Sequence, residues 1–597
     1  MAVIQLENTV LPDQYKALHY MLGSMARQAV GLDTRRYAYS LPCGGGKTQG
    51  AIALIVAAWE LDLGLTFAVA ASHVEALCDF KRQLMGRGIP EQAIGLWHSL
   101  RVNAAKAQAG SGYASLPATP DDDARPILLL SHEKLRRGNI PEYRGQPRSL
   151  TIWDESLIAT RAHAIPVADI QAAAALAPQY APALVPYLAK VAAVATVELD
   201  ALRADPERHP QVFADVLSPG ELDALRAALE GVHGSNSYIR AIRDTTEGLL
   251  SLLDSRVSVV ETGSGKAGDG VLRCDVLVSP ALQNIAILDA SHAIRLLTRA
   301  DPSIVDRTSP EMRAYRRYDN VTLRLINMPT GNRRMAASPA ASLPAAREIA
   351  RAIAAAPADD CVLIFTFKRS LSHLQRNLEK IGVDLSRQIT VDGKQRPRIQ
   401  FLTWGQETSR NDMRHCRLVI MAGVLRRDAL DLAASLTAQQ QAAQPRRNAR
   451  TEVAEVIIAE QAHCVLQGIH RAACRMSDAD GQAGRTDTLI LSADTGGFRA
   501  VLEEAMPGAR WVTSEPMDKQ AGESKTDTAA HAILGYLAGL AENITKVSTR
   551  TLKQAIGAAG ELGTDSFSTA IDRAVQRGVL KGIRWHREGR SLARNTG

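Results

Sequence analysis

The glycine-rich segment LPCGGGKT, at residues 41–48, is the strongest chemical signal in the sequence. Its consecutive glycines let the backbone curl so that amide groups point inward at phosphate oxygens, while Lys47 adds a positive charge and the Thr48 hydroxyl is suited to hold Mg²⁺. Leu41 stands where the Walker pattern usually has its first glycine, but a strand-like YAYS precedes the loop and a helix-like run follows it. The residues predicted to surround nucleotide phosphates are Cys43, Gly44, Gly45, Gly46, Lys47 and Thr48.

The segment TIWDESL, at residues 151–157, supplies two adjacent acids at the end of an apolar strand. A nucleoside triphosphatase needs one carboxylate for the metal ion and another group that orients or deprotonates water. We predict that Asp154 binds Mg²⁺ together with Thr48, and that Glu155 acts as the general base. The alternative is an acidic pair that only solvates a strand end or caps a helix.

With these two segments, the sequence resembles a superfamily-two DEAD/DEAH-type helicase, in which two RecA-like domains close on ATP. LPCGGGKT and DESL look like motifs I and II of that family. The resemblance implies that Gln14, in PDQYKAL, contacts adenine as a Q-motif glutamine; a helix-surface glutamine is the alternative. The resemblance also implies that residues at two strand ends contact a nucleic-acid backbone; the alternative is that they only cap the following helix. These residues are Ser72, His73, Ser131 and His132.

Three further segments follow in the order of the family's motifs. ILDASHAI, with Asp289 and Ser291, resembles motif III, which couples hydrolysis to strand movement. CVLIFTFKRS resembles motif IV and implies a nucleic-acid contact by Thr366. FLTWGQETSRNDMRHC is similar to motif V, with Gly405 and Asn411 as coupling residues. Each similarity is weak alone, and their order carries the resemblance.

The segment QGIHRAACR, at residues 467–475, resembles motif VI. This resemblance implies that Gln467 and two arginines reach from the second domain onto the γ-phosphate, where an arginine finger stabilises the developing charge. The arginines are Arg471 and Arg475, with Cys474 in the position where the family usually has its second arginine. Residues four apart share a helix face, so both guanidinium groups are expected to face one site. Which of them is the finger stays open.

The elements that must position these residues alternate between short apolar runs and helical stretches. This alternation predicts an α/β fold with two RecA-like parallel-sheet domains. An Ala-rich stretch between motifs II and III predicts a mainly helical insertion, placed like the arch of the iron–sulfur helicases, that grips a strand, binds a partner protein or buttresses the core. The predicted divisions are the first RecA-like domain at 1–156 and 281–325, the insertion at 157–280, the second RecA-like domain at 326–514, a linker at 515–527 and a C-terminal module at 528–597.

The C-terminal module shows three short helical stretches followed by a basic hairpin pattern, which looks like a winged helix-turn-helix. Residues 546–597 contain ten Lys or Arg and four Asp or Glu, so the basic excess of the chain is concentrated here. A winged helix places such residues in a DNA groove or on its phosphates; the alternative is a protein-binding module with solvated charges. The candidate DNA contacts are Ser568, Thr569, Arg573, Arg577, Arg584, Arg587 and Arg590.

Composition limits the remaining possibilities. The 597 residues are 46% hydrophobic and 22% charged, with a formal net charge of +7, which excludes a disordered or fibrous chain. The seven cysteines form no CxxC pair, and only Cys78 lies between motifs I and II, so we expect free thiols and no iron–sulfur cluster. No clean apolar run of about 20 residues or secretion signal stands out, so we expect a cytoplasmic protein with no membrane partner.

Together these patterns favour a helicase or translocase that couples hydrolysis of ATP, with Mg²⁺, to movement on single-stranded or forked DNA. Two alternatives stay open: an RNA helicase, and a winged-helix DNA-binding regulator that uses its nucleotide site as a switch. The intact pair of acids argues against the switch, because a switch can lose Glu155. The sequence does not indicate polarity, oligomeric state or pathway.

Overall fold

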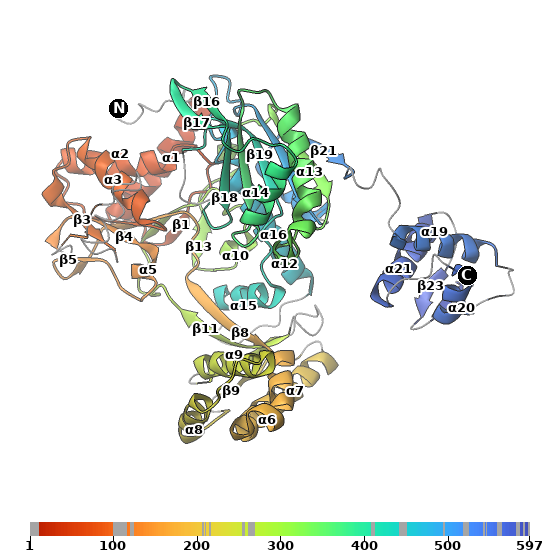
Figure 1. Ribbon diagram of the computed structural model, residues 1–597. Helices are drawn as coiled ribbons and strands as arrows, with labels where there is room; N and C mark the ends of the chain where they lie inside the picture. The colour runs from red at the N-terminus through yellow and green to blue at the C-terminus, as the bar shows by residue number, and fades with distance from the viewer. Residues whose placement is uncertain are drawn as a thin grey trace. The chain divides into compact units, whose positions relative to one another are not determined.

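The computed structural model divides the chain into two units, residues 1–512 and 513–597. We describe each unit by itself (Figure 1). The structure describes residues 11–98, 116, 118–119, 124–205, 208, 210–213, 216–253, 257–260, 269–406, 412–440, 450–493, 496–516, 525–540, 544, 546–557, 564–580, 585–588 and 591–594.

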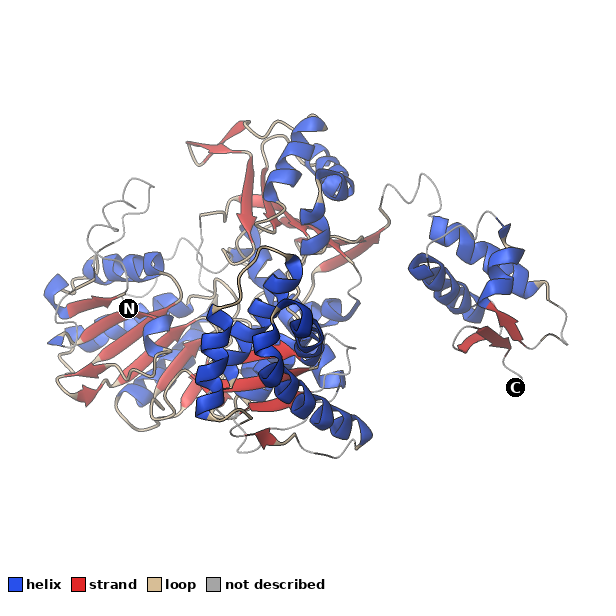
Figure 2. Cartoon of the chain, turned by 60° about the horizontal axis from the view of Figure 1, so that its bottom comes forward, coloured by secondary structure: helices blue, strands red, loops and turns tan. Residues whose placement is uncertain are grey.

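The first sheet has seven strands in the order β13-β1-β12-β7-β2-β4-β3, and every pairing in it is parallel. Its strands are apolar runs because helices cover both faces, as Figure 2 shows. The strands are β1 (Arg36–Ala38), β2 (Phe67–Ala71), β3 (Ile94–Trp97), β4 (Ile127–Ser131), β7 (Leu150–Asp154), β12 (Ile285–Leu288) and β13 (Ile304–Asp306). The main helices are α1 (Pro12–Ala29), α2 (Lys47–Glu60) and α3 (Val74–Met85).

The second sheet has six strands in the order β18-β15-β19-β20-β14-β21. Its strands are β14 (Val321–Asn327), β15 (Cys361–Thr366), β18 (Ile399–Thr403), β19 (Cys416–Ala422), β20 (Thr486–Ser492) and β21 (Arg510–Ser514). The surrounding helices are α12 (Asn332–Ala337), α13 (Pro339–Ala355), α14 (Leu371–Lys380), α15 (Ala429–Gln439), α16 (Arg450–Ile469) and α17 (Gly496–Ala505). The two sheets confirm the predicted pair of RecA-like domains, although β14 places the start of the second one before residue 326.

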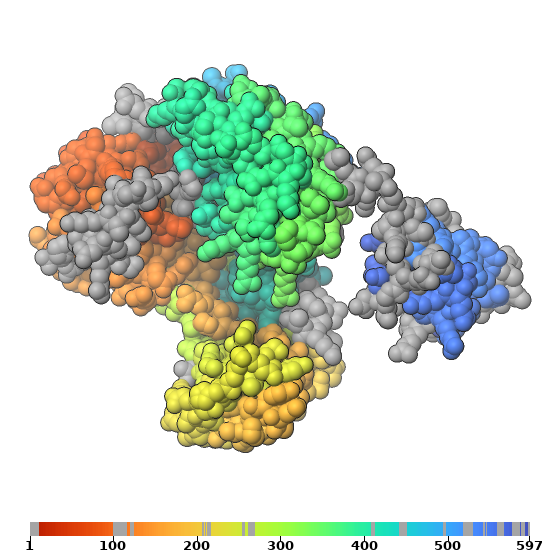
Figure 3. Space-filling model, viewed as in Figure 1, coloured from red at the N-terminus to blue at the C-terminus, as the bar shows by residue number. Residues whose placement is uncertain are grey.

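The insertion between motifs II and III combines helices with a sheet. It contains four antiparallel strands in the order β8-β11-β10-β9. Its residues, coloured orange to yellow, form one lobe in Figure 3. The insertion is therefore less purely helical than the sequence predicted. The elements are β8 (Thr160–Pro166), α6 (Val167–Tyr180), α7 (Val185–Ala204), α8 (Pro219–Glu230), α9 (Ser237–Leu252), β9 (Val212–Phe213), β10 (Val257–Val260) and β11 (Gly270–Val276).

One stretch of the insertion, Pro182–Ala204, is long and apolar enough to cross a membrane by length and composition. A core helix of a globular protein passes the same test. Here Leu188, Leu199 and Leu202 pack into the core of the insertion, where each is at most 5% exposed.

The second RecA-like domain contacts both the insertion and the first RecA-like domain. Thr160, at the start of β8, donates from its backbone and its hydroxyl to Gln439 Oε1 on α15, at 3.1 and 2.7 Å. A separate apolar cluster joins Leu297, on helix α10 (Leu296–Arg299) after motif III, to Leu432 and Leu436 on α15 and Val456 on α16. Below, this group of four side chains is called the lateral cluster.

The C-terminal unit packs three helices against a three-stranded antiparallel sheet in the order β22-β24-β23. Its core includes Ile533, Phe567, Trp585 and Leu592. The assignment of this unit as a winged helix-turn-helix stays a prediction. The elements are α19 (Lys525–Ala538), β22 (Lys546–Ser548), α20 (Thr549–Ala555), α21 (Thr564–Leu580), β23 (Trp585–Glu588) and β24 (Ser591–Arg594).

Candidate functional site

The glycine-rich loop lies between β1 and α2, at the carboxyl edge of the first sheet. Gly44 and Gly46 adopt φ angles of 73° and 92°, a left-handed conformation that side chains disfavour. A Cβ atom added at Gly44 or Gly45 would also collide, with the Arg475 carbonyl or the Tyr315 hydroxyl. The loop therefore needs its glycines, and it directs amide groups and the N-terminus of α2 at one point, which suits an anion.

Lys47 is the first residue of α2 and its side chain is buried. Its ammonium donates to the carbonyls of Leu41 and Pro42, at 2.5 and 3.2 Å. Burial lowers the pKa of Lys47, an effect that the nearby acids Asp154 and Asp289 oppose. An anion bound at the loop would also stabilise the charged form of Lys47, so the position of this lysine favours binding of phosphate.

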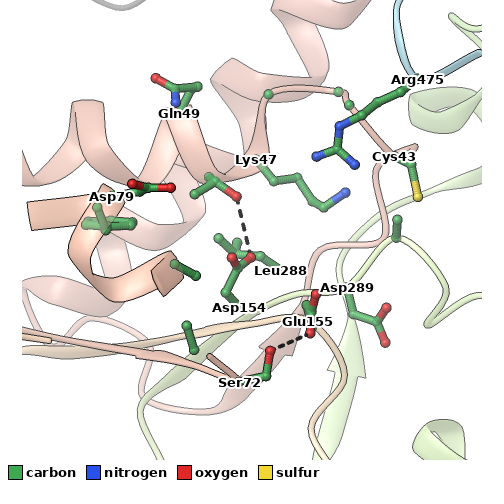
Figure 4. A pocket seen from close by; sticks show the side chains of 18 of the residues that line it. Cys43, Lys47, Gln49, Ser72, Asp79, Asp154, Glu155, Leu288, Asp289 and Arg475 are labelled. Atoms are coloured by element: carbon green, nitrogen blue, oxygen red, sulfur yellow. Dashed lines mark hydrogen bonds between the residues drawn. The ribbon is translucent and has the colours of Figure 1, made fainter. Parts of the chain in front are cut away.

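Asp154 ends β7 and lies opposite the glycine-rich loop (Figure 4). The Thr48 hydroxyl donates to Asp154 Oδ1 at 3.4 Å, a long contact that brings a hydroxyl and a carboxylate together. Burial raises the pKa of Asp154, and the positive charge of Lys47 is the largest effect that lowers it. These hard oxygen donors, together with phosphate oxygens, are the ligand set that Mg²⁺ prefers.

Glu155 follows directly and has a left-handed backbone, with φ at 74°. A non-glycine residue in this region stores strain that functional sites often retain. Ser72 donates its hydroxyl to Glu155 Oε2 at 3.1 Å, which fixes the direction of the carboxylate. Burial and then the neighbouring Asp154 raise the pKa of Glu155 to about 8. A carboxylate with a raised pKa is a stronger base than an exposed one.

Two arginines of the second domain complete the site. The Arg471 guanidinium donates to Gln467 Oε1 at 3.2 Å, and both side chains are buried. Figure 4 shows the Arg475 guanidinium reaching across the glycine-rich loop toward the Lys47 ammonium. The arginines do not share one helix as predicted, because α16 ends at Ile469 and Arg475 closes a separate 3₁₀ turn.

These groups line one cavity of about 700 Å³ between the two RecA-like domains. The first domain contributes the glycine-rich loop, both acids and Asp289, and the second domain contributes Gln467, Arg471 and Arg475. Arg414, which the sequence did not single out, lines the cavity as well. The structure thus brings together residues that lie hundreds of positions apart, in the arrangement that phosphoryl transfer needs.

Asp289 links the acidic pair to the following segment. It accepts hydrogen bonds from the Ser156 hydroxyl at 2.6 Å and from the Ser291 amide and hydroxyl at 2.8 and 2.6 Å. Burial acts to raise its pKa, but His292, His463 and these hydroxyls outweigh burial and hold the pKa below its ordinary value. Asp289 is therefore an anion that connects the acidic pair to the domain boundary.

Gln14 is 1% exposed on α1, which excludes the alternative of a surface glutamine. Its side-chain amide donates to the Gly45 carbonyl at 3.2 Å. Gln14 therefore contacts the glycine-rich loop directly, and its contact with adenine stays a prediction.

Sequence reasoning missed a segment that joins the two sheets. Arg316, 1% exposed, donates to the Cys43 carbonyl in the glycine-rich loop. It also donates to the Arg475 carbonyl at 2.9 Å and to the Ser477 hydroxyl at 3.2 Å. One side chain thus ties the phosphate loop to the turn that carries Arg475. The segment RAYRRYDN contains three arginines, and no local pattern distinguishes Arg316 from the other two.

An ion pair joins the domains close to the cavity. Arg295, after motif III, makes a bidentate contact with Glu460 on α16, at 2.6 and 2.8 Å. Both side chains are at most 11% exposed. Burial acts to raise the pKa of Glu460, but Arg295, and then His463 and Arg427, lower it to about 2.

We expect Glu460→Gln to destabilise the unit of residues 1–512 by about 3–5 kcal/mol, because it leaves the buried Arg295 without its counter-charge. A carboxylate with a lowered pKa stabilises the fold fully above its unfolded pKa, near 4.5, and loses this contribution as the pH falls toward about 2. The variant should lack that pH dependence. Urea unfolding followed by tryptophan fluorescence from pH 7 to pH 3 measures both effects. Asp431→Asn is the control, since Asp431 is 47% exposed in its pair with Arg427 and should cost less than about 1 kcal/mol.

Two residues predicted to contact nucleic acid are buried instead. His132 is 5% exposed and stacks on Trp153 with ring centroids 4.1 Å apart. Burial lowers the pKa of His132 to about 3, so its ring is neutral. Thr366 is fully buried and its hydroxyl contacts Ser370 at 3.1 Å. Neither side chain is exposed in this structure, and their contacts with nucleic acid stay predictions.

The other predicted contacts have varied settings. Ser72 is exposed but bonded to Glu155, whereas His73 and Ser131 are half-buried at the ends of β2 and β4. Gly405 is exposed after β18, with φ at 101°. In the C-terminal unit, Thr569 and Arg573 are exposed on α21 and Ser568 is half-buried. The remaining predicted residues lie outside the described residues or have side chains that are not described: Asn411, Arg577, Arg584, Arg587 and Arg590.

Comparison with models of known protein families finds no match, and comparison with curated proteins finds none. Among solved structures, the chain is similar to an XPD helicase at 11% identity and a TM-score of 0.43, covering 85% of this chain and 100% of that one. It is also similar to S. cerevisiae Dbp5 bound to RNA and ADP BeF3, at 10% identity and a TM-score of 0.37, covering 86% and 95%.

A third similar structure is the Mycobacterium smegmatis helicase Lhr bound to ssDNA and AMP-PNP, at 12% identity and a TM-score of 0.33, covering 98% of this chain and 59% of that one. These likenesses are low in identity and in TM-score. The functional conclusion therefore comes from the site itself: two RecA-like domains that place a phosphate loop, an acidic pair and two arginines around one cavity.

Proposed function

We propose that this protein is a nucleic-acid-dependent ATPase that moves on or unwinds DNA. The observation that carries the proposal is the single cavity in which Lys47, Asp154 and Glu155 of one domain face Arg471 and Arg475 of the other. A site divided between two domains couples hydrolysis to domain movement, because binding and loss of the γ-phosphate change the contacts across the cleft.

Each residue has a defined part in the proposed reaction. The loop amides and Lys47 bind the β- and γ-phosphates, while Gln14 is placed to contact adenine beside the loop. Thr48 and Asp154 would hold Mg²⁺, which neutralises charge on the phosphates when bound. Glu155, oriented by Ser72, takes a proton from the attacking water. The arginines stabilise the charge on the transferred phosphoryl group.

The choice of DNA depends on the C-terminal unit. Its element order is that of a winged helix, and Arg573 and Thr569 are exposed on α21, the helix that such modules place in a groove. The excess of basic residues in 546–597 supports binding to phosphates in the same unit. We propose single-stranded or forked DNA as the substrate.

Steady-state ATP hydrolysis tests this proposal, with the full chain alone and with single-stranded DNA, forked DNA, duplex DNA or RNA. We expect DNA to raise kcat by about tenfold or more, and Lys47→Ala to abolish turnover with every nucleic acid. Stronger stimulation of ATP hydrolysis by RNA than by DNA would identify RNA as the substrate. ATP binding without turnover on any nucleic acid would contradict the motor and favour a nucleotide-switch regulator.

The Arg316 contacts make a further prediction for this ATPase. Arg316→Ala should lower kcat/KM for ATP by about 10- to 100-fold, because the phosphate loop and the Arg475 turn lose their shared support. Arg317→Ala is the matched control, since the neighbouring arginine is 64% exposed and pairs with Asp319. Steady-state kinetics of both variants, with circular dichroism to check folding, make the comparison. Equal losses in the two variants would contradict the assigned role of Arg316.

A further inference from the structure

A cluster of sulfur and nitrogen atoms lies at the start of two neighbouring strands of the second sheet. Cys361 is the first residue of β15, Cys416 is the first residue of β19, and the two are paired across the parallel ladder. Their sulfur atoms lie 2.6 Å apart. One donor atom of each cysteine and one of His415 all lie within 4.8 Å of one another.

The cluster is buried, and a polar side chain contacts it. Cys361 is 1% exposed and Cys416 is fully buried, while His415 is half-buried. The Gln400 side-chain amide contacts Cys361 Sγ at 3.5 Å and His415 Nε2 at 3.2 Å.

We propose that Cys361, His415 and Cys416 bind one thiophilic divalent cation, for which Zn²⁺ is the best match. Two thiolates and one imidazole are a ligand set that Zn²⁺ accepts, with a fourth position left for water or for the Gln400 amide oxygen. An iron–sulfur cluster does not fit, since it needs four such ligands. Among the residues that the structure describes, this is the one group of three or more histidine, cysteine or acidic side chains whose donor atoms lie close enough together to hold one metal ion.

The main competing chemistry is a disulfide between the two sulfurs. A disulfide would need only the cysteines, whereas here an imidazole and an amide also converge on the same pair. Zn–S bonds of about 2.3 Å in a tetrahedron require the sulfurs to separate to roughly 3.7 Å. Both cysteines begin their strands, and the ladder register shifts directly after Cys361. Metal binding would therefore need only a local adjustment at the start of these two strands.

The test is the metal content of the full chain, expressed with zinc in the medium and purified under reducing conditions without a chelator. We expect about one zinc per chain by elemental analysis, and less than about 0.1 in Cys361→Ser and His415→Ala. Cys274→Ser is the matched control, because Cys274 is an exposed cysteine outside the cluster, and it should keep its zinc.

A second measurement covers variants that fail to fold. Titration of the metal-depleted wild-type chain with Co²⁺ should give the thiolate-to-cobalt charge-transfer absorption of a site with two thiolate ligands, saturating at one equivalent. No metal in the wild type and no cobalt absorption would overturn the proposal. So would full zinc retention in Cys361→Ser, or a Cys361–Cys416 disulfide found by peptide mass spectrometry in the native chain. None of these readouts depends on ATP hydrolysis, so the proposal stands or fails separately from the proposed function.

Discussion

Replacement of Glu155 by glutamine is expected to lower kcat for DNA-stimulated ATP hydrolysis by about 10²- to 10⁴-fold, the usual contribution of a general base. The amide keeps the shape of the side chain and still accepts the hydrogen bond from Ser72, but it does not take a proton from water. KM for ATP should change little, because Glu155 lies beyond the residues that hold the phosphates. Steady-state kinetics at saturating DNA measure both parameters.

Asp154→Asn is the informative comparison for this variant. It removes a proposed ligand of Mg²⁺, so it should raise the Mg²⁺ concentration needed for activity as well as lower kcat. Glu155→Gln should leave the Mg²⁺ requirement unchanged. Retention of more than about a tenth of wild-type kcat in Glu155→Gln would assign the base to another group.

Removal of the Arg475 guanidinium is expected to lower kcat by about 10³-fold or more, within the range that arginine fingers contribute. Arg475 reaches the Lys47 ammonium across the loop, where the γ-phosphate of ATP would lie between them (Figure 4). The charge of Arg475 also lowers the pKa of Asp154, whereas Arg471 is the positive charge that most lowers the pKa of Glu155. We therefore expect Arg475→Ala to weaken ATP binding as well, and Arg471→Ala to lower kcat with a smaller change in KM.

Nucleotide-binding titrations and steady-state kinetics separate the two arginines. Arg475→Lys should restore little activity, because an ammonium does not reproduce the planar, bidentate contact of a guanidinium. Arg485→Ala serves as the control, since Arg485 is 59% exposed and pairs with Asp487. Normal turnover in Arg475→Ala together with a large loss in Arg471→Ala would identify Arg471 as the finger.

Local patterns predicted the parts of the fold that depend on neighbours along the chain. The glycine-rich loop, the acidic pair and the order of strands and helices are local signals, and they led to two RecA-like sheets. Arg316, Arg414 and the pair of Arg295 with Glu460 carry no such signal. Their roles arise when segments from different domains pack together.

Residue type alone did not predict which of these side chains are buried. A polar residue at a strand end usually faces solvent, yet His132 stacks under Trp153 and Thr366 lies beneath its own turn. Cys361 and Cys416 were scattered cysteines in the sequence, and only the pairing of β15 with β19 makes them neighbours. The spacing of residues along the chain does not reveal which strands are adjacent in a sheet.

The lateral cluster has a consequence for how the two domains separate. Leu297 of the first domain packs against Leu432, Leu436 and Val456 of the second, away from the charged groups of the ATP cavity. Apolar side chains lose favourable burial when they part, while charged groups regain water. The two domains therefore separate at the lowest cost in free energy by rotating about the lateral cluster, because this keeps its apolar side chains in contact. In the proposed ATPase, loss of a phosphate from the cavity would therefore rotate one domain about the lateral cluster.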